Sequence, residues 1–288
     1  MEELNGIIIV NKPKAYTSHD VVAKVKKILN VGKVGHTGTL DPNATGVLPL
    51  LLNKGTKLSK YLIDHDKVYE VTLKLGIRTD TLDGEGNILE KQIVQWDKLE
   101  DVEKTLSSFV GKQEQVPPMY SAIKVNGKKL YEYARKGQTV EINPRSIEIY
   151  EINLQKIDKE VNEITFKVSC SKGTYIRTLC EDISIKLGTI GYMKELNRLK
   201  VGIFTIQDSL TIQDLECNKE FIKQKLITME QLFKQHPSIN LDKKQLEKFL
   251  NGVNINIKLE DGIYNVYGEK YVGLGIVRNC KLKRDIII

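Results

Sequence analysis

The sequence has few cysteines and histidines, four of each, and they are not spaced as metal ligands or disulfide partners. No two cysteines form a C-x-x-C pair, and the histidines show neither H-x-H nor H-E-x-x-H spacing. Structural zinc sites and disulfide frameworks depend on such spacings. We therefore expect no bound metal, and the scattered thiols are typical of a reducing compartment, which indicates a cytoplasmic protein.

Long apolar runs are also absent. Residues 47–52 are interrupted by Pro49, and near the start residues 7–10 give only four apolar positions before Asn11. Neither stretch predicts a membrane span or a secretory signal. With 288 residues, of which 41% are hydrophobic and 28% charged, the chain is typical of a soluble globular protein that can hold two domains.

The net charge of +7 is concentrated in two segments. Residues 111–145 carry seven Lys and Arg against three Asp and Glu, and residues 239–288 carry nine against six. This distribution is expected of a protein that binds a polyanion, although a lysine-rich surface that only contacts solvent has the same composition.

Hydrophobic periodicity predicts a mixture of strands and helices. Strands are expected at 7–10, 47–52, 67–77, 146–154, 163–170 and 199–206. Helices are expected at 18–30, capped by Ser18, and at 56–65, 97–110, 174–187 and 242–250. Residues 111–144 lack periodicity, but their tyrosines alternate with Lys and Arg, which favours a functional excursion with a short helix near 129–136.

Residues 35–49, GHTGTLDPNATGVLP, form the most informative stretch of the chain. Its three glycines permit positive φ and the close approach of another molecule. Pro42 moves Asp41 away from the helical region. A carboxylate on such a loop, ahead of a buried strand, is a common catalytic arrangement, although a glycine-rich loop with an Asp-Pro pair can also serve only as a turn.

This stretch resembles, almost continuously, the catalytic motif of the TruB-type tRNA pseudouridine synthases, in which the aspartate is essential. The resemblance covers about residues 4–210 and includes further motifs at 11–13 with 17–20, 67–69, 117–135, 171–177 and 196–198. Asn197 departs from the family, which has arginine there. Beyond residue 236 the chain resembles, more weakly, the short PUA domain of bacterial members.

The resemblance implies roles for particular residues. The implied catalytic residues are Asp41, Tyr69 and Arg177. The implied substrate-binding residues are His36, Leu196 and Asp83 in the pocket, with Lys124, Lys128, Lys129 and Arg135 on an RNA-gripping insertion. Considered without the resemblance, Tyr69 would be a core residue, Arg177 a surface partner of Glu181 four positions on, and Asp83 a turn carboxylate.

The implied fold is α+β, with a mixed, mainly antiparallel sheet, flanking helices and a thumb-like insertion. We expect a catalytic domain over 1–236, with the insertion at about 111–145, and a small β-rich, PUA-like RNA-binding domain over 237–288. The implied activity isomerises uridine 55 in the T-loop of tRNA to pseudouridine, by base flipping and aspartate-dependent glycosidic cleavage followed by C–C bond formation.

The expected partner is the T-arm of tRNA, and we expect a monomer with no cofactor, no metal and no membrane association. Two alternatives stay open at the level of sequence. One is a non-catalytic RNA-binding or RNA-chaperone protein with the same fold, and the other is a metal-dependent hydrolase that uses His36 and Asp41.

Overall fold

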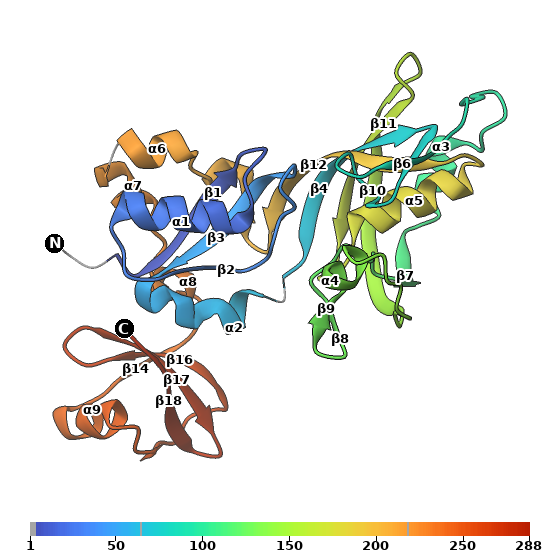
Figure 1. Cartoon of the computed structure of the whole chain (residues 1–288). Helices are drawn as coiled ribbons and strands as arrows, with labels where there is room; N and C mark the ends of the chain where they lie inside the picture. The colour runs from blue at the N-terminus through green and yellow to red at the C-terminus, as the bar shows by residue number, and fades with distance from the viewer. Residues whose placement is uncertain (1–3, 64, 218) are drawn as a thin grey trace.

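The computed structural model describes residues 4–63, 65–217 and 219–288, and within them a nine-stranded mixed sheet forms the frame of the molecule (Figure 1). Its main path, in spatial order, is β1 (Gly6–Lys12), β3 (Thr45–Leu52), β12 (Gly191–Val201), β4 (Lys67–Leu75), β11 (Glu163–Cys170), β10 (Arg145–Asp158) and β7 (Gly111–Gln115). Two short strands, β2 (Val34–His36) and β13 (Phe204–Thr205), pair with β3 and β12. Neighbouring strands are antiparallel except for β3 and β12, which confirms the expected mixed, mainly antiparallel sheet.

Strand β4 forms because its apolar side chains alternate. Tyr69, Val71, Leu73 and Leu75 point into a core that helix α5 (Ile176–Lys186) covers. The expected strand over 67–77 is too long, because Gly76 adopts a φ of 82° and the chain continues into a separate hairpin. That hairpin pairs β5 (Ile77–Thr79) with β6 (Ile88–Lys91).

Several helices differ from their expected boundaries. Helix α1 (Ser18–Leu29) is capped by Thr17, not Ser18, because Thr17 and Asp20 form a reciprocal capping box. The hydroxyl of Ser18 is buried and bonds to the backbone of Leu40 instead.

Two other expected helices are shorter. Helix α3 covers only Val102–Ser107, although the side chains that gave the longer periodicity still pack against the core. The segment expected as a helix over 56–65 is a 3₁₀ turn, η1 (Asn53–Leu58), followed by α2 (Ser59–Leu62), and residue 64 lies outside the described residues. The expected strand over 199–206 is divided: residues 199–201 end β12, which begins at Gly191, and Phe204–Thr205 form the separate strand β13.

The insertion contains the expected short helix, and a hairpin that the sequence pattern did not predict precedes it. Strands β8 (Lys124–Val125) and β9 (Lys128–Lys129) are joined by Asn126 and Gly127, both with positive φ, which suits a tight hairpin turn. Helix α4 (Leu130–Ala134) follows directly.

The last part of the chain forms a five-stranded sheet of β14 (Ser238–Asn240), β16 (Gly262–Tyr267), β17 (Tyr271–Arg278), β18 (Lys281–Ile287) and β15 (Ile255–Asn256). It is joined to the large sheet through η2 (Ile206–Asp208), α6 (Ile212–Cys217), α7 (Lys219–Lys225) and α8 (Met229–Leu232), and α9 (Lys243–Leu250) packs beside it. Tyr61 donates a 2.6 Å hydrogen bond to Asp285 and so ties α2 to β18. In the parts of the chain that the structure describes, no helix is long and apolar enough to span a membrane.

Gly46 allows β3 to lie against β12. Its φ is 105°, and a Cβ at this position would overlap the backbone oxygen of Arg198 and lie 2.7 Å from the backbone nitrogen of Arg198. Only glycine fits here without a shift of the backbone. The close approach of β3 to β12 at Gly46 fixes the end of the loop that carries Asp41.

We expect Gly46→Ala to reduce the free energy of unfolding more than Gly188→Ala does. Gly188 also has positive φ, 86°, but a Cβ there would meet nothing within 4 Å, so only the backbone strain of ~1–2 kcal/mol applies. Gly46→Ala should lose a further ~1–3 kcal/mol from steric overlap. Urea unfolding measures both variants, and equal losses would contradict the proposed close crossing.

Candidate active site

A cavity of about 460 Å³ lies where five segments of the chain meet. Its walls come from the loop between β2 and β3 (residues 37–44, hereafter the motif loop), from β4 and β12, from the start of α5 and from the insertion. The lining residues are Thr39, Leu40, Asp41, Tyr69, Tyr120, Ser121, Ala122, Tyr131, Thr174, Tyr175, Ile176, Arg177, Met193 and Leu196. The structure thus brings the expected Asp41, Tyr69, Arg177 and Leu196 to one place.

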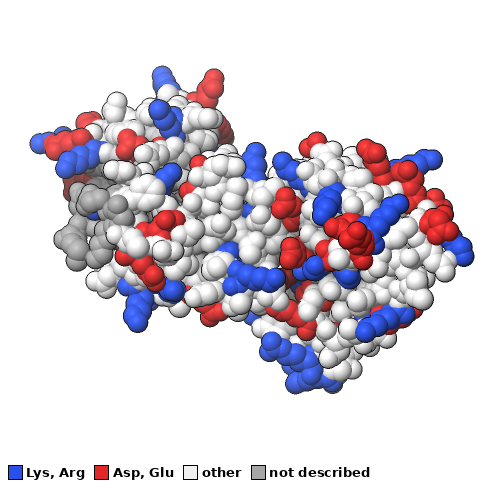
Figure 2. All heavy atoms as spheres, turned by 90° about the horizontal axis from the view of Figure 1, so that it is seen from above, with Lys and Arg blue, Asp and Glu red and all other residues white. Residues whose placement is uncertain are grey.

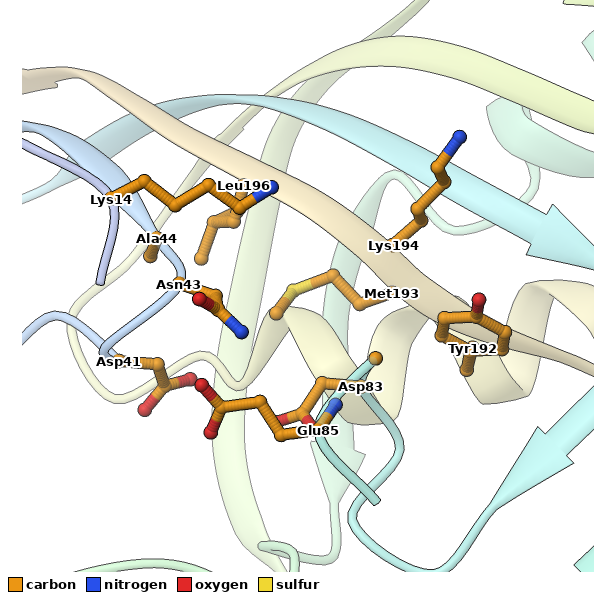
Figure 3. Close-up of a pocket in the computed structure, with 11 residues that line it drawn as sticks. Lys14, Asp41, Asn43, Ala44, Asp83, Glu85, Tyr192, Met193, Lys194 and Leu196 are labelled. Atoms are coloured by element: carbon orange, nitrogen blue, oxygen red, sulfur yellow. The ribbon is translucent and has the colours of Figure 1, made fainter. Parts of the chain in front are cut away.

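A smaller cavity of about 210 Å³ lies on the other side of Asp41. Figure 3 shows the carboxylates of Asp41, Asp83 and Glu85 gathered along one side of it, while Met193 and Leu196 extend from β12. Asp41, Met193 and Leu196 line both cavities. Asp41 therefore lies between two adjoining hollows and is accessible to a substrate group.

Arg177 holds Asp41 from the first turn of α5. Its Nε lies 3.2 Å from one carboxylate oxygen of Asp41, and its Nη2 lies 3.5 Å from the other, so that the contact is bidentate. Its Nη1 lies 3.5 Å from a carboxylate oxygen of Asp83, and its Nη2 donates a 2.9 Å hydrogen bond to the backbone oxygen of Tyr120.

The surface ion pair considered for Arg177 is not present. The Arg177 side chain is only 9% exposed, and Glu181 pairs instead with Arg78, at 3.4 Å from Nε to Oε1. Asp83 keeps its turn role as well, since one of its oxygens accepts a hydrogen bond from the backbone of Glu85. Asp83 therefore serves both the turn and the arginine.

Opposing effects act on the pKa of Asp41. Desolvation raises the pKa above its ordinary value, and the neighbouring charge of Asp83 adds to this increase. The guanidinium of Arg177 and, to a smaller extent, Lys12 lower it. The pKa of Asp41 is on balance raised above its ordinary value, while the bidentate contact favours the ionised carboxylate.

Tyr69 is both a core residue and part of the cavity wall. It is 7% exposed, and its neighbours on β4 face the same core. Burial raises the pKa of Tyr69 to about 12, and the nearby Arg198 opposes that increase. The Tyr69 phenol is therefore neutral at pH 7, and the residue forms part of the cavity wall.

His36 and the basic residues of the insertion lie outside the walls of both cavities. His36 ends β2, accepts a 3.3 Å hydrogen bond from the backbone of Gly38 and contacts His19 edge to face, with ring centroids 5.7 Å apart. Burial, and to a smaller extent the charges of His19 and Arg198, lower the pKa of His36, so the ring is neutral at pH 7. In the described part of the chain, no three His, Cys, Asp or Glu side chains group as metal ligands.

The insertion leads from exposed cations to the cavity. Lys124 and Lys128 are exposed on the β8–β9 hairpin. Lys129 and Arg135 lie against the ring of Tyr131, each 5.3 Å from its centroid, and Tyr131 lines the larger cavity. On the face shown in Figure 2, acidic and basic side chains are interspersed. Local clusters of cations, such as those of the insertion, are therefore expected to attract an anion more than the net charge of the protein does.

Sequence reasoning gave no role to two buried cations beside the motif loop, Lys12 and Arg198. Lys12 is fully buried and donates a 2.8 Å hydrogen bond to the backbone oxygen of Pro42, and burial lowers its pKa to about 8. Arg198 is 2% exposed and donates to the backbone oxygens of Gly38 and Val47. Both residues lie inside sequence motifs that the family resemblance covers, and this position could have identified them as functional from the sequence.

Comparisons with known proteins identify the family of this chain. Residues 26–176 match the family model of the TruB family pseudouridylate synthase (N terminal domain), and residues 177–255 match that of the tRNA pseudouridylate synthase B C-terminal domain. A tRNA pseudouridine synthase B of Clostridium kluyveri is 42% identical, over 97% of this chain and 98% of that protein. The protein of the same name from Mesoplasma florum is 51% identical over 74% of each chain.

Among solved structures, a chain of a Cbf5-Nop10-Gar1 complex superimposes with a TM-score of 0.68 at 26% sequence identity. The match covers 95% of this chain and 78% of that chain. The likeness therefore extends over the whole arrangement of the large sheet and the smaller C-terminal sheet.

We expect the carboxyl signal of Asp41, followed by ¹³C NMR, to titrate above pH 3.8 and to move in opposite directions in two variants. Asp83→Asn removes a like charge and should lower the pKa, whereas Arg177→Gln removes the opposite charge and should raise it. Asp158→Asn, a change at an exposed pair with Lys156, should leave the titration unchanged. A wild-type Asp41 that titrates below 3.8 would contradict the desolvation argument.

Proposed function

This chain belongs to the TruB family of pseudouridylate synthases, and we propose that it converts uridine 55 in the T-loop of tRNA to pseudouridine. The name shared by its relatives, tRNA pseudouridine synthase B, supports tRNA as the substrate. The observation that carries the proposal is the bidentate Asp41–Arg177 pair, set in a cavity with Tyr69 on its wall.

The isomerisation breaks the bond between uracil nitrogen and ribose carbon and joins the same ribose carbon to a carbon of the same base. It needs no redox step and no energy source. Asp41 would act either as a nucleophile or as a base on the sugar, and both roles require an ionised, aimed carboxylate. The planar fork of Arg177 provides both conditions through two parallel contacts.

The remaining cavity residues would receive the base. A uridine inside folded RNA cannot reach Asp41, so it must flip out of its stack. Tyr69 would stack on the uracil and relay the proton released from carbon late in the reaction, its neutral phenol accepting that proton as its own proton passes to solvent, while Leu196 lines the pocket. Asp83 would hold Arg177 from the other side, and His36, next to the cavity, would support the stack that the base vacates.

The wider surface would bind the T-arm. We assign the catalytic domain to 1–236, with the insertion at about 111–145 as the part that grips RNA through Lys124, Lys128, Lys129 and Arg135. Residues 237–288 would be a PUA-like RNA-binding domain, and the protein would act as a monomer in the cytoplasm. A non-catalytic RNA-binding role is less favoured, because the Asp41–Arg177 pair lies at an open cavity and not in a filled core.

Asp41→Asn should abolish pseudouridine formation and leave tRNA binding largely unchanged. Asparagine keeps the shape of the side chain but removes the charge needed for either chemical role, so the single-turnover rate should fall by at least ~10²–10⁴. The measurement is pseudouridine mapping on an unmodified tRNA transcript, with Asp158→Asn as the control. A rate within tenfold of wild type would remove Asp41 from the reaction.

Changing Lys124, Lys128, Lys129 and Arg135 together to glutamine should weaken tRNA binding and reduce its salt dependence. For every phosphate that these cations no longer neutralise, the slope of log K against log salt should fall by ~0.7–0.9. Glutamine at Lys156 and Lys159, at the far turn between β10 and β11, is the control. An unchanged slope would show that the four cations of the insertion face only solvent.

A further inference from the structure

We propose that Arg198 is a positioning residue of this reaction, and that Arg198 and Asn197 together hold both ends of the motif loop that presents Asp41. Neither residue touches the larger cavity, so the effect on the reaction would act through the loop. The inference rests on the proposed function, because its kinetic test uses that activity.

The guanidinium of Arg198 bridges the two sides of the motif loop. Its Nε donates a 2.8 Å hydrogen bond to the backbone oxygen of Val47, just after the loop. Its Nη2 donates at 3.1 Å to Gly38 and its Nη1 at 3.5 Å to Thr39, at the start of the loop. One rigid planar group therefore fixes the separation of the two loop ends.

Asn197 adds a second hold at the end of the loop. Its side-chain oxygen accepts a 3.3 Å hydrogen bond from the hydroxyl of Thr45, and Asn197 and Arg198 pair in parallel register with Thr45 and Gly46. Asn197 and Arg198, two consecutive residues of β12, therefore hold the motif loop together, and we call this pair the clasp.

The motif loop needs such an external hold because it has few bonds of its own. Among the backbone hydrogen bonds described for it, one joins Ala44 to Asp41 across the turn. The middle of the loop is held by other residues: Arg177 contacts the Asp41 side chain, Lys12 bonds to Pro42, and the buried Ser18 hydroxyl bonds to the backbone of Leu40. None of these contacts holds the two ends. With its ends released, the tip would shift relative to Tyr69.

Arg198 also lies directly opposite Tyr69 in the pairing of β12 with β4. Its charge opposes the increase that burial causes in the pKa of Tyr69 and adds to the effects that lower the pKa of Asp41. A buried guanidinium costs free energy unless its donors are paired, and here three backbone oxygens accept from it. The same buried group therefore lies beside Tyr69 and bonds to the loop that carries Asp41.

The test compares wild type with Arg198→Lys, Thr45→Val and the control Arg78→Lys, whose arginine pairs with Glu181 away from the motif loop. Lysine keeps the charge but cannot span three acceptors. We expect the single-turnover rate of Arg198→Lys on an unmodified tRNA transcript to fall at least fivefold, since displacement of a reacting group by ~1 Å can cost ~10²-fold. The Kd for tRNA should stay within twofold, and Arg78→Lys should match wild type.

Two results for Arg198→Lys would overturn the inference. One is a single-turnover rate within fivefold of wild type. The other is a rate and a tRNA affinity that fall together, because a general packing defect would affect both. If Arg198→Lys does not show a cooperative melt, Thr45→Val provides the test instead. A single-turnover rate at least twofold lower than wild type, at unchanged Kd, supports the proposed hold on the loop ends, and an unchanged rate overturns it.

Amide hydrogen exchange gives a readout that needs no activity. Loosened loop ends should make residues 37–44 exchange faster in Arg198→Lys than in Arg78→Lys. If the wild-type protein makes no pseudouridine on the transcript, only the proposed tRNA activity is refuted, and the exchange comparison then tests whether Arg198 holds the loop. Equal exchange of residues 37–44 in Arg198→Lys and Arg78→Lys overturns the proposed role of Arg198.

Discussion

The guanidinium of Arg177 joins four segments that are far apart in the sequence. It contacts Asp41 of the motif loop, Asp83 of the turn after β5 and the backbone of Tyr120 in the insertion, all from the first turn of α5. A charge so deeply buried is costly unless most of its donors are paired, and these partners supply that pairing. The aim of the Asp41 carboxylate therefore depends on the correct placement of all four segments.

The charge balance of the site has a consequence for its substrate. Three carboxylates, Asp41, Asp83 and Glu85, border the smaller cavity, and a nucleic acid that approaches them brings further negative charge. The buried cations Lys12 and Arg198 lie behind the motif loop, and the exposed cations lie on the insertion. This order suits an enzyme that attracts phosphates at its rim and keeps a single activated carboxylate inside.

Local patterns in the sequence predicted the long strands β1, β3, β4, β10 and β11, because alternation and apolar runs depend on neighbouring residues, whereas the candidate site residues Tyr69 and Arg177 followed from the family resemblance. Local patterns did not predict the partner of Arg177. The helical spacing suggested Glu181, but a contact between residues 136 positions apart has no local signal. The roles of Thr17 as the cap, of Gly46 at the crossing and of Arg198 in the core likewise depend on where β12 and α1 pack, which spacing does not reveal.

The smaller C-terminal sheet is not an independent appendage to this site. Leu274 and Ile286 of that sheet belong to the same buried cluster as Val47 and Leu51, which lie on β3 directly after the motif loop. Buried side chains of this kind are close-packed and transmit displacement with little compression. Strand β18, which carries Lys281 and Lys283, is therefore packed against the strand that follows the motif loop. If an RNA contacts both the cavity at Asp41 and the cations of β18, the distance between these two sites on the protein would contribute to the choice of substrate.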